Sequence, residues 1–475
     1  MVFDKQTAER VNAYLGENRG NIVRDLMRLI RVPSIRSDAL PGAPYGAACL
    51  AGLREAVALF RENGFDARIS EGNLYGIATY GEGERTVGLF GHTDVVPVGE
   101  GWDYCPPFEP AEVEGCVVGR GSIDNKSAIV ISLYVMRAVR DLSIPIGGKI
   151  VAFIGAAEET GMEDVAAFVS ENSMPDFSII PDNDYPVSLG EKGICRFFAR
   201  SRERFSDILS FEGGLAFNVV LDRVDVGVRS DSALARALPG AIGDDPAFSL
   251  TEQGGVTVLT AKGVTAHASA PKDSINAANR ACRLLLSLPA LKERDRKVLN
   301  SAADLLSGVW GEPFGLSHDD PWFGPVTTVN GMVRVEDGKL DLSFDFRYGT
   351  SVPAAFVEQK IDETLSRVGF DLLSLDNDEG FRLPEDLPAA RTVIETYRRL
   401  TGDASAVPYY SAGGTYARHL KNAFSVGTSL PGYPLPKMRI GHGGEHQPDE
   451  AINIDGLIGS AVMTLAMATE LLNTL

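Results

Sequence analysis

Apolar residues recur at helical spacing in the N-terminal part of the chain. Residues 5–33 and 46–64 show this period, and Leu26, Leu29 and Ile30 fall on one stripe of the first stretch. A helix with such a stripe buries it against an apolar core. We therefore predict N-terminal helices that pack on a larger structure.

Short apolar runs bounded by glycine and charged residues are typical of buried strands. Three such runs lie at residues 86–90, 149–154 and 177–180, and helical periodicity at 126–142 and 162–171 separates them. The alternation of strand and helix predicts an α/β fold with a mostly parallel sheet. In a sheet of this kind, ligands bind at the carboxyl ends of the strands.

The pattern changes after Gly190. Amphipathic strands are expected at residues 193–200, 214–222, 246–263, 324–336 and 339–348, and helices at 272–288, 291–305 and 352–368. Alternation of helix and strand returns near residue 387 and ends in an apolar helix at 455–472. We therefore expect a split α/β domain of residues 1–190 plus 380–475, with an α+β domain of residues 191–379 inserted into it.

Composition narrows the class of protein. The chain has 475 residues, more than one average core accommodates, and 44% of them are hydrophobic and 23% charged, as in globular proteins. Its formal net charge of −19 argues against nucleic acid or an anionic membrane as a partner, because both attract basic patches.

Cysteine usage and the absence of targeting signals favour a cytoplasmic protein. The five cysteines are scattered and lack CxxC spacing, which is typical of a reduced intracellular set. The segment from Met1 to Lys5 lacks the basic and apolar regions of a signal peptide. The uncharged run between Asp455 and Glu470 is expected to be too short to cross a bilayer.

Residue types that bind divalent metals follow the predicted strands. His92, Glu158 and Asp182 each come just after one of the three apolar runs, so we expect them at one edge of the sheet. Histidine nitrogens and carboxylate oxygens are ligands of zinc and similar ions. Two such ions beside a spare glutamate activate water, which predicts a hydrolase.

His92 fits either a structural histidine at a strand end or a metal ligand. Asp94 follows two residues later and can accept the other imidazole N–H, which fixes the tautomer that donates to a metal. This spacing favours ligation. Asp182 fits either a further ligand or a turn-forming aspartate after Pro181.

Asp124 follows the turn Gly119-Arg120-Gly121 and precedes a predicted helix. It could cap that helix by accepting a backbone N–H, or bridge two metals with its two oxygens. The spacing leaves both roles open.

Glu158 and Glu159 are adjacent acids directly after an apolar strand. This position suits two separate roles, in which one carboxylate binds metal and the other takes a proton from water.

The segment from His442 to His446 matches the H-x-x-E-H pattern of inverted zinc proteases, which requires both histidines on one helical face. Gly443 and Gly444 would cost such a helix about 2 kcal/mol. We therefore expect a loop that delivers His446 alone.

In chain order these segments read H-x-D at 92–94, G-R-G-x-x-D-x-K at 119–126, E-E at 158–159, an aspartate at 182 and a histidine at 446. The order resembles the M20 family of metallopeptidases over nearly the whole chain. Within that family, residues 413–418 and 446–450 look most like those of PepV-type dipeptidases.

The resemblance implies a split catalytic domain of the zinc-exopeptidase type, an inserted lid domain, and two divalent metal ions. His92 and Asp182 would hold one ion, Glu159 and His446 the other, and Asp124 would bridge them. The ions would be zinc, although manganese and cobalt also suit these ligands.

The resemblance also implies roles around the metals. Asp94 would orient His92, and Glu158 would be the general base. In the lid, His267 resembles the histidine that polarises the scissile carbonyl, and Asn218 resembles an asparagine that contacts substrate. From the residue alone, a polar histidine at a strand end is more often structural.

Substrate binding follows from the same resemblance. Arg347 would grip the C-terminal carboxylate of a short peptide, together with the backbone of Gly413, Gly414 and Thr415. The implied reaction is hydrolysis of a dipeptide or other short peptide by water between the metals, with Glu158 as base. A lid as long as residues 191–379 resembles a doubled form that replaces a partner subunit, which implies a monomer.

Two other functions remain. An N-acyl amino acid deacylase or a small carboxypeptidase would use the same metal centre. A catalytically inactive peptide-binding protein is the non-enzyme alternative, but such a protein has no need of Glu158.

Overall fold

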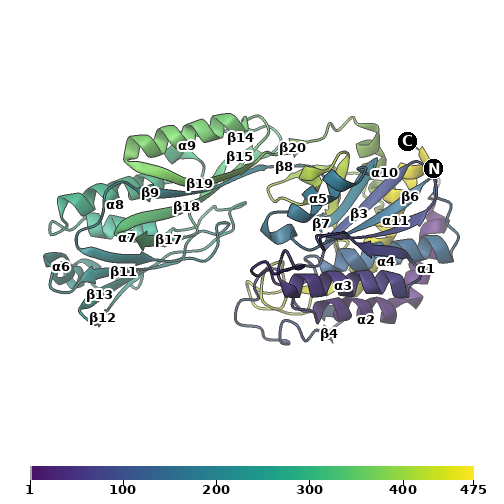
Figure 1. Cartoon of the computed structure of the whole chain (residues 1–475), viewed down its shortest axis with the longest axis horizontal. Coiled ribbons are helices and arrows are strands. Elements are labelled where there is room, and N and C mark those ends of the chain that lie inside the picture. The colour runs from purple at the N-terminus through teal and green to yellow at the C-terminus, as the bar shows by residue number, and fades with distance from the viewer. Residues whose placement is uncertain (1–2, 475) are drawn as a thin grey trace. The chain divides into compact units, whose positions relative to one another are not determined.

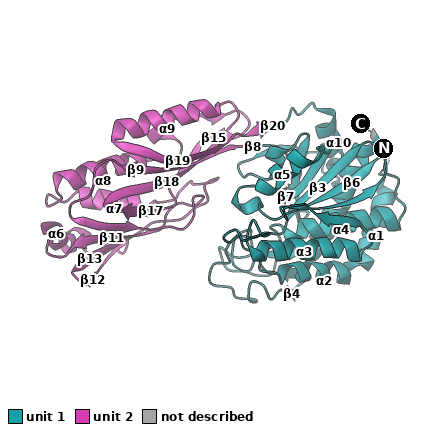
Figure 2. Ribbon diagram, in the orientation of Figure 1, with its two compact units in different colours: residues 1–190, 382–475 teal, residues 191–381 magenta. Residues whose placement is uncertain are grey.

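The computed structural model describes residues 3–474 and forms two compact units (Figures 1 and 2). Unit 1 comprises Met1–Gly190 and Arg382–Leu475, and unit 2 comprises Glu191–Phe381. Each unit has its own apolar core. The predicted fold class is confirmed, because unit 1 is an α/β structure with a mostly parallel central sheet and unit 2 is α+β.

The main sheet of unit 1 has the strand order β1-β2-β6-β3-β7-β22-β8-β20, with β21 paired to β8 (Figure 1). The central strands β6, β3, β7 and β22 run parallel, and β2 and β8 flank them in antiparallel pairs. The strands are β1 Asp66–Ile69, β2 Gly76–Gly81, β3 Thr86–His92, β6 Lys149–Gly155, β7 Phe177–Asn183, β8 Ser188–Glu191, β20 Phe381–Arg382, β21 Tyr409–Ser411 and β22 Ala423–Gly427. A small separate sheet joins β4 Ala111–Val113, β5 Cys116–Val118 and β23 Ala451–Asn453.

The helices of unit 1 are α1 Lys5–Glu17, α2 Arg19–Ile30, α3 Ala47–Glu62, α4 Lys126–Asp141, α5 Glu163–Glu171, α10 Pro388–Thr401 and α11 Ile454–Thr474, with short 3-10 turns at η1 Glu158–Thr160 and η3 Tyr416–His419. The single helix expected over residues 5–33 is two helices. Asn18 ends α1, where its side chain donates to the carbonyl of Tyr14 at 2.9 Å and competes with helix continuation.

Successive side chains of the central strands point to opposite faces of the sheet. On β3, Val87 and Leu89 belong to the main core, which the apolar faces of the surrounding helices complete. Phe90 points the other way and lies in an aromatic cluster with Phe153 and Tyr416. Tyr416 also packs edge-on against the ring of His92, with the ring centroids 6.3 Å apart.

Among the residues that the structure describes, one helix is long and apolar enough in composition to cross a membrane. It is α11, whose segment Ile454–Asn473 has a mean hydropathy of 1.3. However, 89% of that apolar window is buried inside the structure, as in a core helix. Its fully buried residues, Leu465 and Ala466 among them, form part of the unit 1 core.

Unit 2 contains two larger sheets, β16-β18-β9-β19 with β17 on β18, and β10-β11-β13-β12. Its strands are β9 Gly193–Ser201, β10 Ile208–Glu212, β11 Arg223–Arg229, β12 Phe248–Gln253, β13 Val256–Lys262, β14 Asp319–Asp320, β15 Gly324–Pro325, β16 Thr327–Val329, β17 Val333–Glu336, β18 Lys339–Tyr348 and β19 Phe370–Asp378. Its helices are α6 Ala233–Ile242, α7 Ala277–Leu286, α8 Glu293–Leu305 and α9 Ala354–Val368, with a 3-10 turn at η2 Glu312–Phe314.

Three strand predictions in unit 2 need correction. The strand expected at 324–336 is interrupted and forms the three short strands β15, β16 and β17. The strand expected at 214–222 is wrong, because this segment is a loop between β10 and β11 that makes isolated backbone hydrogen bonds with several separate segments, including residues 266–268 and Asn330. The strand expected at 246–263 is a hairpin. It turns at Gly254 and Gly255, whose positive φ angles of 59° and 81° suit a tight reversal.

Candidate metal centre

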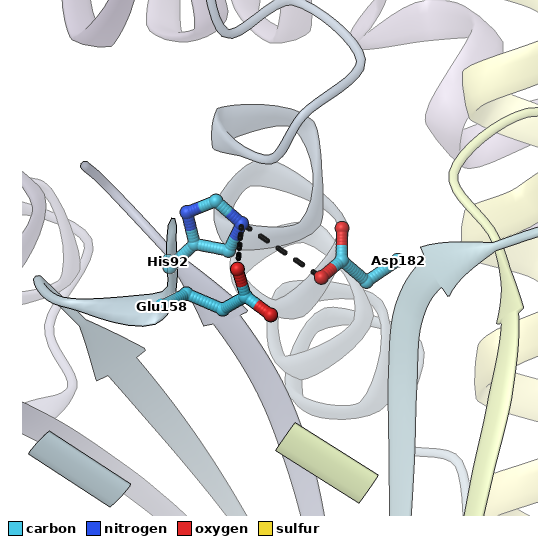
Figure 3. Close-up of side chains that lie close together, drawn as sticks. All are labelled: His92, Glu158 and Asp182. Atoms are coloured by element: carbon cyan, nitrogen blue, oxygen red, sulfur yellow. Dashed lines mark ion pairs between the residues drawn. The ribbon is translucent and has the colours of Figure 1, made fainter. Parts of the chain in front are cut away.

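Three strand ends bring the first group of candidate ligands together (Figure 3). His92 is the last residue of β3, Asp182 lies near the end of β7, and Glu158 opens the η1 turn after β6. His92 Nε2 lies 3.7 Å from Asp182 Oδ2 and 4.0 Å from Glu158 Oε2. The parallel arrangement of these adjacent strands therefore produces the cluster that the sequence predicted.

A second group forms beside the first from Asp124, Glu159 and His446. His446 Nε2 lies 2.8 Å from Asp124 Oδ2 and 3.3 Å from Glu159 Oε2. The other oxygen of Asp124, Oδ1, lies 3.0 Å from His92 Nε2. Asp124 thus joins the two groups, with one oxygen turned to each histidine.

Two alternatives from the sequence are now decided. The residue that flanks the start of α4 is Asn125, so the N-cap role for Asp124 is wrong. Residues 442–446 form turns and bends rather than a helix, so the predicted loop that delivers His446 is confirmed.

The cluster has the properties expected of a metal site. His92 Nε2 and Glu159 Oε1 are buried and have no hydrogen-bond partner, and the Asp124 oxygen beside His92 Nε2 lies outside hydrogen-bond geometry. A buried polar atom without a partner costs about 1–3 kcal/mol. Two imidazoles and several carboxylates suit zinc, manganese or cobalt. The residues present therefore fit a pair of divalent ions.

The electrostatics of the cluster favour bound protons when cations are absent. Burial raises the pKa of Glu158 and of Asp182 well above their usual ranges. Burial and the charge of Asp124 raise the pKa of Glu159 to about 7. Burial lowers the pKa of His446, but its hydrogen bonds with Asp124 and Glu159 outweigh this and raise it to about 12. Metal ions would replace these protons.

Asp94 contacts both His92 and the turn that contains Glu158 and Glu159. His92 Nδ1 lies 3.0 Å from the backbone oxygen of Asp94 and 3.4 Å from its carboxylate. The same carboxylate accepts the backbone N–H groups of Glu158 at 3.2 Å and Glu159 at 3.1 Å. Asp94 therefore fixes the turn that presents both glutamates, which the sequence did not indicate.

Asn125 is a site residue that sequence reasoning missed. Its Nδ2 donates to Asp182 Oδ1 at 2.6 Å, and its Oδ1 accepts the backbone N–H of His92 at 3.2 Å. The only signal in the sequence is its place next to Asp124.

A buried pair behind the glutamate turn was also missed. Tyr416 donates its hydroxyl to Asp164 at 2.5 Å, and the same carboxylate oxygen accepts the N–H groups of Ala156 and Ala157, at 2.7 and 2.9 Å. These two residues directly precede Glu158, so the pair holds the start of the turn. Proximity of Tyr416 to the segment at 413–415 was the only sequence signal.

Replacing Tyr416 by Phe should therefore loosen the turn. We expect the free energy of unfolding to fall by about 1–3 kcal/mol, because buried Asp164 loses a donor, and kcat to fall about tenfold through the displaced glutamates. Urea unfolding and initial rates measure the two effects. Tyr75→Phe is the matched control, since its hydroxyl lies in the same aromatic cluster but bonds Glu171. An equal loss of kcat in both variants would contradict this role.

A third group of similar residue types, Asp103, His442 and Asp449, is already saturated by protein contacts. Asp449 accepts the N–H groups of Asp103 and Tyr104 and binds His442 Nδ1 at 2.6 Å. Arg439 Nε lies 2.8 Å from Asp103. These contacts link the loop that contains Asp103 to the loop that contains His442 and Asp449.

The predicted substrate residues of unit 2 divide into two places. Asn218 and His267 lie on facing backbone segments, since Val219 bridges His267 and Ala268 donates to the carbonyl of Asn218. Arg347 is on β18, where its guanidinium is buried and paired with Asp345 at 2.6 and 3.0 Å.

The predicted backbone anchor lies in unit 1, between β21 and η3. The N–H of Gly413 donates to Ser411 at 3.0 Å, and Thr415 caps η3 by accepting the N–H of Ala417. Gly414 lies between them.

Comparison with known proteins identifies the family of this chain. The sequence profile described as Peptidase family M20/M25/M40 matches residues 88–470, which include both metal-ligand groups. The chain belongs to this family. It is therefore a peptidase, a hydrolase of peptide bonds.

Relatives within the M20 family support the same placement. A Bacillus subtilis (strain 168) protein named "Putative dipeptidase YtjP" is 26% identical over 464 residues, covering 95% of this chain and 97% of that protein. Human carnosine dipeptidase 1 has a similar crystal structure, with a TM-score of 0.61 at 16% identity over 98% of both chains. Bacillus subtilis YXEP, titled a dinuclear metal binding peptidase from the M20 family, gives a TM-score of 0.52 at 9% identity over 97% of this chain and 100% of that one. At such identities the solved structures show a shared fold.

Proposed function

We propose that this M20 peptidase is a dipeptidase that uses two divalent metal ions. His92 and Asp182 would hold one ion, Glu159 and His446 the other, and Asp124 would bind both. The observation that carries the proposal is the position of Asp124, whose two oxygens face the two histidines at 3.0 and 2.8 Å. The unpartnered atoms of His92 and Glu159 support it.

Bound ions would polarise the scissile carbonyl and make water a better nucleophile. Glu158 lies beside this cluster and takes the proton of the attacking water. It then returns that proton to the leaving amine. Asp94 keeps Glu158 in place through the backbone N–H of that residue. The buried surroundings of Glu158 exclude bulk water from this proton transfer.

Recognition of a short peptide is assigned to Gly413, Gly414 and Thr415 and, in unit 2, to Asn218, His267 and Arg347. His267 would stabilise the oxyanion, and Arg347 would bind the substrate carboxylate. The adjacency of Asn218 and His267 supports a shared task for these two residues. The names of the relatives, which describe dipeptidases, support a dipeptide as substrate.

A substrate panel tests this proposal. Purified protein is stripped of metal, reloaded separately with zinc, manganese or cobalt, and given free dipeptides, dipeptide amides, N-acetyl amino acids and longer peptides. We expect hydrolysis of free dipeptides and a fall in kcat/KM of about 10–100-fold for the amides, since a lost charged hydrogen bond costs about 1.5–3 kcal/mol. Preference for N-acetyl amino acids would replace dipeptidase by deacylase, and preference for longer peptides would indicate a carboxypeptidase.

The proposal also covers the oligomeric state of the protein and its cellular compartment. The two large sheets of unit 2 support a doubled lid and a monomer, which light scattering at micromolar concentration tests. All five cysteines are free, which supports a reducing compartment such as the cytoplasm.

A further inference from the structure

One ion pair next to the cluster is almost completely buried. Arg120 Nη1 lies 2.6 Å from Glu450 Oε2, and the two side chains are 1% and 0% exposed. Arginine and glutamate are almost never buried to this extent unless they are paired. Even a paired, buried arginine and glutamate often stabilise a fold no better than apolar residues of the same size. The contacts of this pair indicate a different role.

Glu450 accepts hydrogen bonds from the backbone of the loop that contains Asp124. Its Oε1 accepts three backbone N–H groups, from Gly121 at 3.1 Å, Ile123 at 2.8 Å and Asp124 at 3.1 Å. A single carboxylate oxygen thereby sets the backbone position of Asp124.

Arg120 contacts the backbone of His446, another member of the same ligand group. Its Nη2 donates to the backbone oxygen of His446 at 3.2 Å, and its guanidinium lies 5.4 Å from the centre of the Trp102 ring. His446 has a φ of 62°, a left-handed conformation that is uncommon for residues other than glycine. The pair thus fixes Asp124 through Glu450 and His446 through Arg120.

The two remaining ligands of the first ion are held by other residues. Asn125 bonds both Asp182 and the backbone of His92, and Asp94 contacts the His92 ring. The ion pair makes none of these contacts. Of the proposed ligands, it supports Asp124, which both ions would share, and His446, which only the second ion would bind. Its influence is therefore larger on the second ion.

We propose that Arg120 and Glu450 are positioning residues for the metal ion bound by Asp124, Glu159 and His446. Their loss weakens this ion by a larger factor than the ion at His92 and Asp182, which shares only Asp124 with it. The inference rests on the proposed pair of metal ions. It assigns the preferential weakening of one ion to residues that are not themselves ligands.

Metal titration of Glu450→Gln tests the inference without any substrate. The amide keeps the shape of the side chain but removes the charge opposite Arg120. Stripped protein is titrated with zinc against a chromophoric chelator, and bound metal per chain is counted by mass spectrometry. We expect one ion to bind about 10–100-fold more weakly, as when a residue that supports a metal ligand is lost, and the other to be weakened by a clearly smaller factor.

Arg120→Lys is a second, milder variant. Lysine keeps a positive charge for Glu450 but lacks the second arm that reaches His446. We expect the same ion to be weakened by a smaller factor. This variant keeps the test decisive if Glu450→Gln does not fold.

Glu470→Gln is the matched control. Glu470 is also a buried glutamate of unit 1 that pairs with an arginine, Arg399, at 3.1 Å and accepts a backbone N–H, from Phe3. It lies in α11, away from the ligands in sequence and contacts. We expect a lower melting temperature with both ions bound as in the wild type.

A His446→Ala background identifies the ion concerned. This variant removes a ligand of the second ion, so adding Glu450→Gln should lower the affinity of the remaining ion by a smaller factor than it lowers the more weakly bound ion of the single variant. Equal weakening of both ions, two ions of unchanged affinity in Glu450→Gln, or an equally large loss in the double variant would overturn the inference alone. A wild-type chain that takes up fewer than two ions would overturn the proposed metal pair and the inference together.

Discussion

Glu158→Gln should reduce kcat by about 10²–10⁴-fold, the usual contribution of a general acid–base residue. The amide preserves the size of the side chain and its place beside His92, but it cannot accept a proton from water. The metal ions should remain, because the proposed ligands are unchanged. KM should change little, since the substrate contacts are made by other residues. Initial rates and metal counts on the same preparation measure these quantities.

Glu163→Gln is the matched control for this variant. Glu163 begins the helix after the same turn, but its carboxylate faces Arg36 at 2.8 Å rather than the cluster. We expect its kcat to stay near the wild-type value. Full activity of Glu158→Gln with metal bound would contradict the assigned base. Loss of metal together with activity would instead make Glu158 a ligand.

Removal of metal should abolish hydrolysis, and addition of zinc, manganese or cobalt should restore it. The candidate ligands are buried or partly buried except for His446, which is exposed, and His92 Nε2 and Glu159 Oε1 have no hydrogen-bond partner to replace an ion. Metal binding should also raise the melting temperature. An ion at 100 times its dissociation constant stabilises the folded state by about 2.7 kcal/mol.

The same prediction has a pH dependence of definite sign. Without metal, the raised pKa values of Glu159, Asp182 and His446 leave these groups holding protons near neutral pH. Divalent ions bind only the deprotonated forms, so apparent affinity should increase with pH and binding should release protons. Calorimetry in buffers of different ionisation enthalpy counts the protons. Unchanged hydrolysis after exhaustive chelation, or proton uptake on binding, would contradict the metal centre.

Local patterns were sufficient to predict much of unit 1. The apolar runs at β3, β6 and β7 are mostly buried strands, and such strands stand out in a sequence because both faces are apolar. Parallel strands place their carboxyl ends at one edge, so His92, Glu158 and Asp182 could be grouped before the structure was known.

Other features depended on contacts between distant segments. β22 is a central parallel strand beside β7, yet its five residues gave no distinct signal of their own. The loop at 214–222 has the alternation of a strand, but its backbone partners are scattered over residues 266–268, Asn330 and other segments instead of forming a ladder. Periodicity describes a segment by itself and carries no information on the neighbour that completes its hydrogen bonds.

The sequence by itself determined the α/β class, the expected insert and the residue types of a metal site, because these follow from short-range periodicity and from the ligand chemistry of histidine and carboxylate. Only the tertiary structure decided that Asp124 lies between two histidines instead of capping a helix. It also brought Asn125, Tyr416, Arg120 and Glu450 into hydrogen-bond contact with the candidate ligands or with the segments that carry them. These roles arise from hydrogen bonds between residues up to 330 positions apart, as between Arg120 and Glu450. Such contacts exist only once the chain has folded, and local sequence patterns do not encode which distant partners will meet.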